Sequence, residues 1–244
     1  MIEAHGGLER FNNIQSIALT VNVSGMLWKR KAGLGHRQAT MIVEPWLPKA
    51  TFIDLLGNGD KSTKWVWTPQ AVWKEGSDGA IIEKRETPRE AFKGHEVPTP
   101  WDHLHLLYFS GYAITNYMCT PFYFTWPGFE AREVDNQLED SIHRKWRVLE
   151  VTYPEGFDAH CKVQKYYFDQ NHLLRRLDYH ADVVGSTSTA HMCYDHQNAN
   201  GLVVPMLRRA LRPEGLEAGG PSAVLLDIQD VQVKDKESAM KHNL

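Results

Sequence analysis

We predict a β-hairpin in the segment His172-Leu-Leu-Arg-Arg-Leu-Asp-Tyr-His-Ala-Asp-Val183 and its continuation Ser188-Thr-Ala-His-Met-Cys-Tyr-Asp-His-Gln197. Successive side chains of a strand point to opposite faces, so every second residue shares a face. In the first arm this places on one face Leu173, Leu177, Tyr179, Ala181 and Val183, and on the other Leu174, Arg176, Asp178, His180 and Asp182. The alternation predicts an antiparallel sheet with one apolar side.

The pairing of the two arms decides which polar side chains meet. A turn at residues 184–187 predicts three cross-strand pairs on the polar face: His180 with His191, Asp178 with Cys193, and Arg176 with Asp195. This face has two interpretations, which the sequence leaves open. It is a solvated outer surface, as is usual for an antiparallel sheet, or it is the polar floor of a cavity in which histidines and carboxylates do acid and base chemistry.

Further strand-like runs recur at short spacing on both sides of the hairpin. They are separated by Gly, Pro and Asn turns and lie at residues 16–28, 36–43, 49–55, 63–68, 71–75, 80–85, 130–134, 145–153, 163–169, 202–211 and 224–233. A sheet of about ten strands tends to curl or close. The sequence therefore predicts a strongly curved antiparallel sheet.

Helical patterns are few. Residues 2–12 predict a short N-terminal helix, and residues 88–124 predict a helical insertion whose main helix runs from 101 to about 118. We expect a mainly β (α+β) single domain over residues 1–244, an open half-barrel with the helices filling its concave side. The charged end of the chain, 235–244, is expected to fray.

Composition narrows the class of protein. The net charge of −3 offers no long-range field for nucleic acid, and the longest apolar stretch, 104–126, contains too many breaks for stable membrane insertion. The chain opens without a basic, apolar leader, so we expect a cytoplasmic protein. Three widely spaced cysteines predict neither disulfides nor zinc, and nucleotide-binding motifs are missing, so we expect no cofactor and no metal.

Several motifs carry a resemblance to a known superfamily. They are Ala4-His-Gly-Gly-Leu-Glu-Arg10, Ala91-Phe-Lys-Gly-His95, Thr99-Pro-Trp-Asp-His-Leu-His105, Tyr108-Phe-Ser-Gly-Tyr112, Tyr166-Tyr-Phe-Asp169 and Ala190-His191 with Asp195. In this order they resemble the half-barrel fold of the bacterial lipoprotein-localisation carriers (LolA/LolB-like), and most closely a poorly characterised soluble branch of it. The resemblance implies an open barrel that receives an acyl chain or another hydrophobic ligand. Fold analogy does not fix chemistry.

The predicted main helix carries a stripe of candidate site residues. Trp101, His105, Tyr108 and Tyr112 are spaced three or four apart, and Asp102 precedes His105 by three. A contact between Asp102 and His105 would raise the basicity of the imidazole, as a general base requires. The alternative is that Asp102 caps the helix and His105 is an ordinary semi-buried ring.

Aromatic residues suggest the lining of a ligand cavity. Trp65, Trp67 and Tyr123 belong to a set of indole, phenol and phenyl rings that is larger than one small core requires. Trp65 and Trp67 share a strand face, and Tyr123 lies in a segment, 121–126, that we interpret as a lid or mouth loop. With Trp101, Tyr108, Tyr112 and His180 they are the predicted ligand-binding residues. Core packing is the alternative role.

The leading hypothesis joins these features. A hydrophobic small molecule binds in the concave cavity and undergoes a cofactor-free isomerisation or cyclisation, as in a biosynthetic enzyme. His191 and His105 would exchange protons, Asp195, Asp102 and Asp178 would orient them, and Arg176 would neutralise a carboxylate or enolate. The alternatives are a non-catalytic carrier of an acyl chain or other lipophilic ligand, and a scaffold without a ligand.

Overall fold

The computed structural model describes residues 1–139, 145–213 and 220–237. Its helices are α1 (Leu8–Asn12), α2 (Met26–Ala32) and α3 (His103–Cys119), with 3-10 turns η1 (Glu3–His5), η2 (Pro88–Phe92), η3 (Phe122–Thr125) and η4 (Asp182–Val184). Its strands are β1 (Ile14–Ser24), β2 (Arg37–Glu44), β3 (Lys49–Ile53), β4 (Lys64–Trp67), β5 (Ala71–Glu75), β6 (Ile81–Glu86), β7 (Glu130–Glu139), β8 (Lys145–Thr152), β9 (Val163–Phe168), β10 (Leu174–Ala181), β11 (Thr187–Ala199), β12 (Leu202–Leu211) and β13 (Val224–Asp235).

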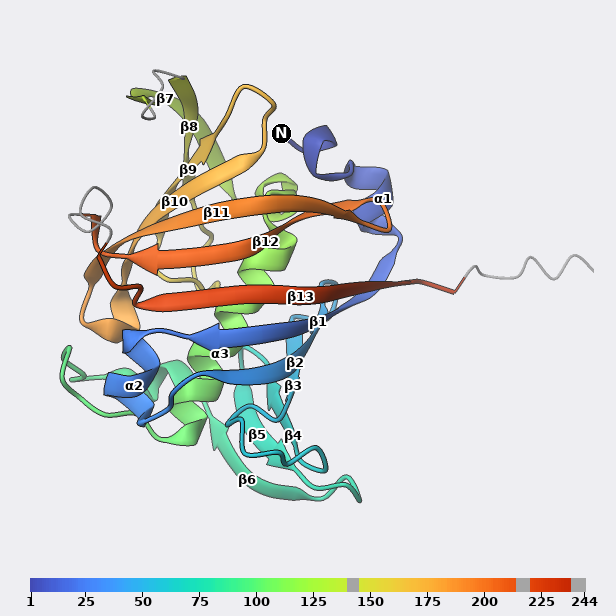
Figure 1. Ribbon diagram of the computed structural model, residues 1–244, viewed down its shortest axis with the longest axis vertical. Coiled ribbons are helices and arrows are strands. Elements are labelled where there is room, and N and C mark those ends of the chain that lie inside the picture. The colour runs from blue at the N-terminus through green and yellow to red at the C-terminus, as the bar shows by residue number, and fades with distance from the viewer. Residues whose placement is uncertain (140–144, 214–219, 238–244) are drawn as a thin grey trace, which may run out of the picture.

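All these strands form one antiparallel sheet. Their order is β6-β5-β4-β3-β2-β1-β13-β12-β11-β10-β9-β8-β7, so the first and last strands pair in the middle. Strands β6 and β7 are the two edges and do not pair with each other, and the sheet curves around α3 as an open half-barrel (Figure 1). The predicted mainly β, curved antiparallel fold is confirmed.

Helix α3 fills the concave side of the sheet. Of its seventeen residues only His103 and His105 are not buried, as expected for a helix surrounded by protein. Gly111 allows close packing, because a Cβ at this position would lie 2.2 Å from Trp67 Cγ on β4. Within the described residues no helix is both long and apolar enough to cross a membrane.

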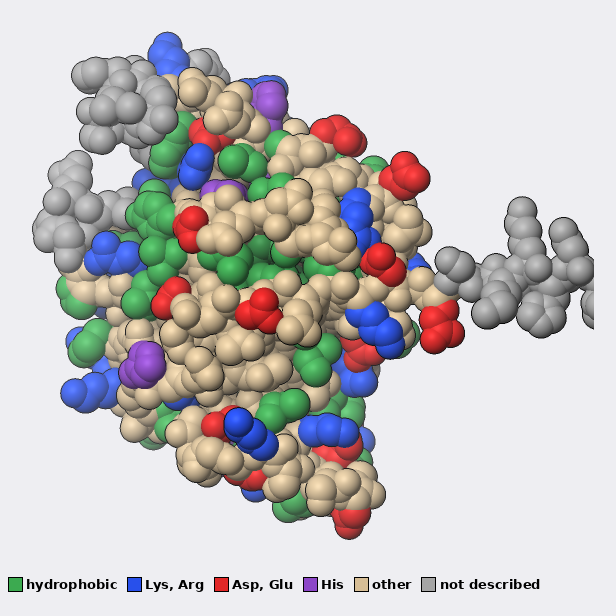
Figure 2. Space-filling model, turned by 45° about the vertical axis from the view of Figure 1, so that its right-hand side comes forward, with side chains coloured by type: hydrophobic (Ala, Val, Ile, Leu, Met, Phe, Trp, Pro, Cys, Tyr) green, Lys and Arg blue, Asp and Glu red, His purple; other side chains and the backbone are tan. Residues whose placement is uncertain are grey.

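The strand faces explain this arrangement. In β1 the buried residues alternate, and Ile17, Leu19, Val21 and Val23 all belong to the main core. The convex face carries interspersed acidic and basic side chains where Figure 2 shows it. A second, smaller cluster of Trp146, Val148 and Tyr167 lies apart from the main core, on strands β8 and β9.

Three predicted element boundaries are wrong. The first strand ends at Ser24 rather than residue 28, because Gly25 (φ 125°) packs against the backbone of Ala223 and directs the chain into α2. The N-terminal helix is broken in two at Gly6 and Gly7, both at positive φ. The tail is tied down at its start, where Asp235 pairs with Arg10 at 2.6 Å; residues 238–244 lie outside the described part of the chain.

The predicted hairpin exists, but its register is wrong by three residues. Strand β10 ends at Ala181, η4 follows, and β11 begins at Thr187, so Ala181 pairs with Thr187 and His180 pairs with Ser188. His191 pairs with Leu177 instead of His180. Because the side-chain period is two, an odd shift moves every residue of β11 to the other face. His191 therefore lies on the same side of the sheet as Leu177 and Tyr179.

Candidate functional site

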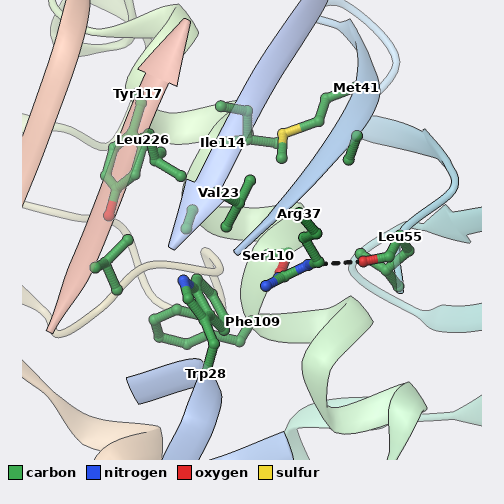
Figure 3. Close-up of a pocket in the computed structure, with 13 residues that line it drawn as sticks. Val23, Trp28, Arg37, Met41, Leu55, Phe109, Ser110, Ile114, Tyr117 and Leu226 are labelled. Carbon is green, nitrogen blue, oxygen red and sulfur yellow. Dashed lines mark hydrogen bonds between the residues drawn. The ribbon is translucent and has the colours of Figure 1, made fainter. Parts of the chain in front are cut away.

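A small hollow lies between α3 and the concave face of the sheet (Figure 3). Its volume is about 20 Å³, which is room for about one water molecule. Its walls come from the start of α2, from β1, β2 and β13, and from the middle of α3, and the lining is Val23, Trp28, Arg37, Ala39, Met41, Leu55, Phe109, Ser110, Ala113, Ile114, Tyr117, Val224 and Leu226. The polar groups of this lining are the Arg37 guanidinium, the Ser110 and Tyr117 hydroxyls and the Trp28 ring nitrogen. The other side chains are apolar.

Arg37 is the charged group of this hollow. Its guanidinium donates from Nε to the Leu55 carbonyl at 2.9 Å and stacks 5.0 Å from the Trp28 ring centre. Its Nη1 is buried and has no hydrogen-bond partner among the described residues. Burial lowers the pKa of Arg37 to about 10, and at neutral pH the group still carries its charge.

A second hollow, of about 100 Å³, adjoins the first at one end of the half-barrel. Phe109 and Val224 line both. Its other walls come from α2 and from the ends of β10 to β13, and include Leu27, Tyr179, Ala181, Val184, Ala210 and Leu211, with Arg30, Lys31 and Arg212 as the cationic members. We call this second hollow the mouth. Exposed Arg30 and Arg212 in its lining place the mouth at the protein surface.

A buried histidine and three tyrosines lie between the two hollows. His160 is 2% exposed and lies 3.1 Å from the Tyr112 hydroxyl through Nδ1 and 2.8 Å from the Tyr117 hydroxyl through Nε2. Its ring also stacks on Tyr179 at 3.9 Å. Burial, with a smaller effect of Arg89, lowers the pKa of His160 to about 3. A neutral imidazole has one N–H, so one tyrosine donates to it and the other accepts from it.

His191 lies next to this group. It is 0% exposed, its Nδ1 lies 3.5 Å from the Tyr179 hydroxyl, and its ring packs edge-on against Tyr117. Burial, then the nearby Arg208, holds the pKa of His191 well below its ordinary value. Its Nε2 has no protein partner in the described part of the chain. The predicted site residue His191 is thus a neutral, interior histidine.

A second polar group lies one to two turns away along α3. The Tyr108 hydroxyl donates to Asp158 at 2.6 Å, and Arg89 of η2 donates to that hydroxyl at 3.2 Å and to the Ala159 carbonyl at 3.1 Å. Burial raises the pKa of Asp158, although Tyr108 and Arg89 oppose the shift. Tyr108 and Tyr112 therefore lie in the polar interior, where they bond to Asp158 and His160 respectively.

The predicted residues at the start of α3 form its cap. Asp102 accepts the His105 backbone N–H at 2.8 Å, and Arg85 contacts both carboxylate oxygens, at 3.1 and 2.6 Å. Burial opposes ionisation of Asp102, but Arg85 and the His105 N–H outweigh it and lower its pKa to about 2. The capping alternative is confirmed as a capping box, because His105 Nδ1 accepts from the Asp102 backbone N–H at 3.3 Å. The same Nδ1 lies 2.8 Å from Asp102 Oδ1.

His105 and His191 do not meet. The His105 ring packs against Phe92 and His95, and its Nε2 lies 3.1 Å from the Ala91 carbonyl. His191 packs against Tyr117, twelve residues further along α3, or about 18 Å at 1.5 Å per residue. Direct proton exchange between the two histidines is excluded by this separation.

The remaining predicted site residues of the hairpin line neither hollow, although His180 lies 3.2 Å from Ser188 of the mouth. Arg176 binds both oxygens of Asp178, at 2.6 and 2.7 Å, and stacks 5.1 Å from Tyr167 of the small convex cluster. His180 is exposed beside Ser188, and Asp195 is exposed at positive φ and accepts from Gln197. The predicted pairs Arg176–Asp195 and Asp178–Cys193 are wrong, because the register shift pairs Arg176 with Met192 and Asp178 with Ala190.

The predicted aromatic residues all lie in the core. Trp67 packs under Gly111 of α3, Trp65 lies edge-on to His103, and Trp101 packs against Phe92 and Phe109. Tyr123 packs on Trp126 at 4.2 Å. None of these four rings lines the two hollows described above, so their core-packing alternative fits the structure better.

Sequence reasoning missed several residues of the interior. Arg37 had a signal, because in the run 37–43 it shares the strand face of Ala39, Met41 and Val43, where a charge is out of place. Tyr117 and Tyr179 were visible only as apolar-face aromatics. His160 lies in the loop between β8 and β9, outside any periodic pattern, and only the fold brings it to Tyr112.

Comparisons with known proteins support the fold. No family model matches the chain, and no curated protein matches it in sequence. A LolA superfamily protein from Nitrosomonas europaea is similar in structure, with a TM-score of 0.55, 7% identity, and coverage of 96% of this chain and 92% of that one. A DUF1329 family protein from Desulfovibrio piger gives a TM-score of 0.52, 9% identity, and coverage of 93% and 88%.

These matches define the class of structure. The chain has a LolA-like fold, as its motifs predicted. At this level of identity the similarity concerns the fold alone, so the chemistry has to be argued from the residues of this chain.

Proposed function

We propose that this protein binds a lipophilic small molecule between α3 and the concave face of its sheet. The observation that carries the proposal is the pair of adjoining hollows, which share Phe109 and Val224 and reach the protein surface at the mouth. Ligand sites are concave and mostly apolar, with a few placed polar groups. The LolA-like fold agrees with this proposal, because the superfamily resemblance implies a hydrophobic ligand.

Binding would use the helix and the sheet together. Ile114 of α3 lies beside Val23 of β1 and Met41 of β2 at the first hollow (Figure 3), which Ala113 of α3 also lines. A ligand there would replace contacts that these side chains make with one another. Each buried methylene of the ligand would contribute about 0.8 kcal/mol of transfer free energy. The burial of several methylenes would therefore offset the free-energy cost of moving α3 away from the sheet.

A cavity-filling variant tests the proposal. Ala113→Phe adds a ring to the wall of the first hollow, and Ala80→Phe adds the same ring at an exposed turn. Calorimetric titration with decan-1-ol is expected to show binding to the wild type and to Ala80→Phe, and at least tenfold weaker binding to Ala113→Phe. Absence of binding to the wild type, or an unchanged affinity in Ala113→Phe, would contradict the proposal.

Native mass spectrometry, followed by organic extraction, identifies any ligand that is bound to the purified protein. An apolar molecule at one copy per chain would identify the ligand, and we expect Ala113→Phe to lose it. The cytoplasmic localisation predicted from the sequence is kept as part of the proposal, and fractionation of the source cells tests it.

Acid and base catalysis on the bound ligand is the second candidate function. The group of His160, Tyr117 and Tyr179 favours it, since Tyr117 lines the first hollow and Tyr179 lines the mouth, and both contact His160. In this proposal the neutral imidazole of His160 moves a proton through a tyrosine hydroxyl, as an isomerase or cyclase without a cofactor requires. His191 would hold Tyr179 in place.

The extracted ligand separates the enzyme from the carrier. Incubation with the wild type should convert it to an isomer of equal mass, resolved by chromatography, if the protein is an enzyme. His160→Gln and His191→Gln should then still bind it but lose turnover, and His105→Gln should retain turnover. A ligand recovered unchanged from the wild type would leave the carrier as the function.

A further inference from the structure

We infer that the ligand is an anionic amphiphile whose acidic group is bound by Arg37. The inference rests on the proposed lipophilic ligand and names its chemical class: an apolar chain that ends in a carboxylate or a phosphate. It would bind with its head at the guanidinium and its chain along the two hollows.

The first step is the charge of the interior. Arg37 is 6% exposed, and within the described residues it forms no ion pair with a carboxylate. The lining of its hollow contains no Asp or Glu. Burying a charge without a counter-ion is costly, and the Leu55 carbonyl and the Trp28 ring recover only part of that free energy. An acidic ligand group would supply the missing counter-charge.

The second step is the geometry of the donor. Nε of Arg37 donates to the Leu55 carbonyl, and the rest of the guanidinium extends toward Trp28, Phe109 and Ser110 (Figure 3). The buried, unpartnered Nη1 belongs to this end of the group. The Trp28 ring supports the guanidinium from one face, which keeps its donor plane fixed. Planar guanidinium groups suit carboxylate and phosphate oxygens for this reason.

Two other buried cations, Lys31 and Arg208, are hydrogen-bonded within the protein, although Arg208 Nε also has no partner among the described residues. Lys31 Nζ donates to the carbonyls of Glu96 and Thr99, each at 2.9 Å. Arg208 is 1% exposed, and it donates to the Tyr117 carbonyl at 3.1 Å, where it caps the C-terminal end of α3. Arg208 lines neither hollow. Arg37 is therefore the buried cation that a ligand in the hollow would reach.

The third step is the path of the chain. From Arg37 the apolar lining continues past Phe109 and Val224 to Ala210 and Leu211 at the mouth. Exposed Arg30 and Arg212 lie at that opening, where they would attract an anionic amphiphile from solution. A neutral lipid would gain from the apolar lining but not from these cations.

Three probes with the same ten-carbon chain test the inference. Calorimetric titrations below the micellar range would compare decanoate, decyl phosphate and decan-1-ol at pH 8. We expect at least one of the anions to bind the wild type at least tenfold more tightly than the alcohol, and the tighter of the two identifies the acidic group. Arg37→Gln should remove that preference and leave the affinity for decan-1-ol within about twofold.

Two further variants control for folding and for surface charge. Arg37→Lys keeps the positive charge and should retain part of the preference for the anion. Arg132→Gln removes an arginine whose side chain is 74% exposed, and it should bind all three probes as the wild type does. If Arg37→Gln does not fold, Arg37→Lys decides, because an anion preference in Arg37→Lys equal to that of the wild type would overturn the role of the guanidinium.

The outcomes distinguish the role of Arg37 from the proposed binding of a lipophilic ligand. Equal affinity of the wild type for the anions and the alcohol would overturn the role of Arg37 and leave the lipophilic ligand standing. A preference for the anion that persists in Arg37→Gln would also overturn it. Failure of all three probes to bind would overturn the proposed function and this inference together.

Discussion

Replacing Gly111 with alanine measures how closely α3 lies on the sheet. The added Cβ would lie 2.2 Å from Cγ and 2.4 Å from Cβ of Trp67. Carbon atoms pack at about 3.5–4.0 Å, so the helix and the strand would have to separate by more than an ångström. The Trp67 Cβ is fixed by the β4 backbone, and rotation of the indole cannot relieve that part of the clash.

The expected change follows from two opposing effects. Overpacking a core costs about 1–3 kcal/mol, and a clash with atoms that cannot rotate belongs at the upper end. Alanine gains about 1 kcal/mol over glycine in a helix. We expect Gly111→Ala to lower the free energy of unfolding by about 2 kcal/mol, which shifts the urea midpoint down by roughly 0.7 M for a slope near 3 kcal/mol/M.

Urea denaturation followed by far-UV circular dichroism gives the midpoint, and the near-UV spectrum reports on Trp67. The control is Gly35→Ala, because a Cβ at Gly35 meets no atom within 4 Å; its free energy of unfolding should change by less than about 0.5 kcal/mol. A midpoint of Gly111→Ala equal to or above that of the wild type would mean that helix propensity outweighs the contact. The close approach of α3 to Trp67 would then be refuted.

Three further predictions follow from groups described above. The pKa of His160 is lowered to about 3 in the fold and is near 6.5 in the unfolded chain, so the unfolded chain binds more protons and the free energy of unfolding falls as the pH drops from 6.5 toward 3. The urea midpoint of His160→Gln should therefore change less between pH 7.5 and 5 than that of the wild type. An equal change in the two proteins would contradict the burial of a neutral imidazole. Asp102→Ala removes the cap of α3 and should lower the free energy of unfolding by about 1 kcal/mol. Asp102→Asn can still cap the helix and should lower it less. Equal urea midpoints for Asp102→Ala and the wild type would refute a stabilising role of the cap. Burial raises the pKa of all three thiols, but only Cys161 is partly exposed, whereas Cys119 and Cys193 are buried. A maleimide should therefore label only Cys161 in the native protein and all three cysteines after unfolding. Rapid native labelling of a second cysteine, located by peptide mapping, would contradict the buried positions.

Local patterns predicted the elements well. The alternation in 37–43 and 202–211, with Gly and Pro between the runs, was enough to identify strands, and the spacing of Leu104, Leu107 and Tyr108 identified α3. These signals are local consequences of the strand and helix periods. They do not depend on how the chain closes, so the curved sheet with a helix inside it could be predicted.

The site was harder to predict, because it depends on one turn. Gly185 at φ 70° ends η4, and Thr187 Oγ1 donates to the Val184 carbonyl, so the connection is residues 182–186 and not 184–187. It begins two residues earlier and ends one residue earlier than predicted, which together shift the register by three. A sequence pattern fixes the faces of each arm but not the parity of the turn between them. His191 was therefore assigned to the polar face with Asp178 and His180, although it lies on the opposite face, inside with Tyr117 and Tyr179.

The pairing of β1 with β13 at the centre of the sheet has a consequence for folding. Strand β1 ends at residue 24, and its partner on one side begins at residue 224. During synthesis the hairpins from β1 to β6 can form early, but that edge of β1 stays open until β13 has left the ribosome. Contacts of such long sequence separation slow folding, and an open edge strand is prone to aggregation. Closure by β13 is therefore the step at which we expect nascent chains to depend most on chaperones.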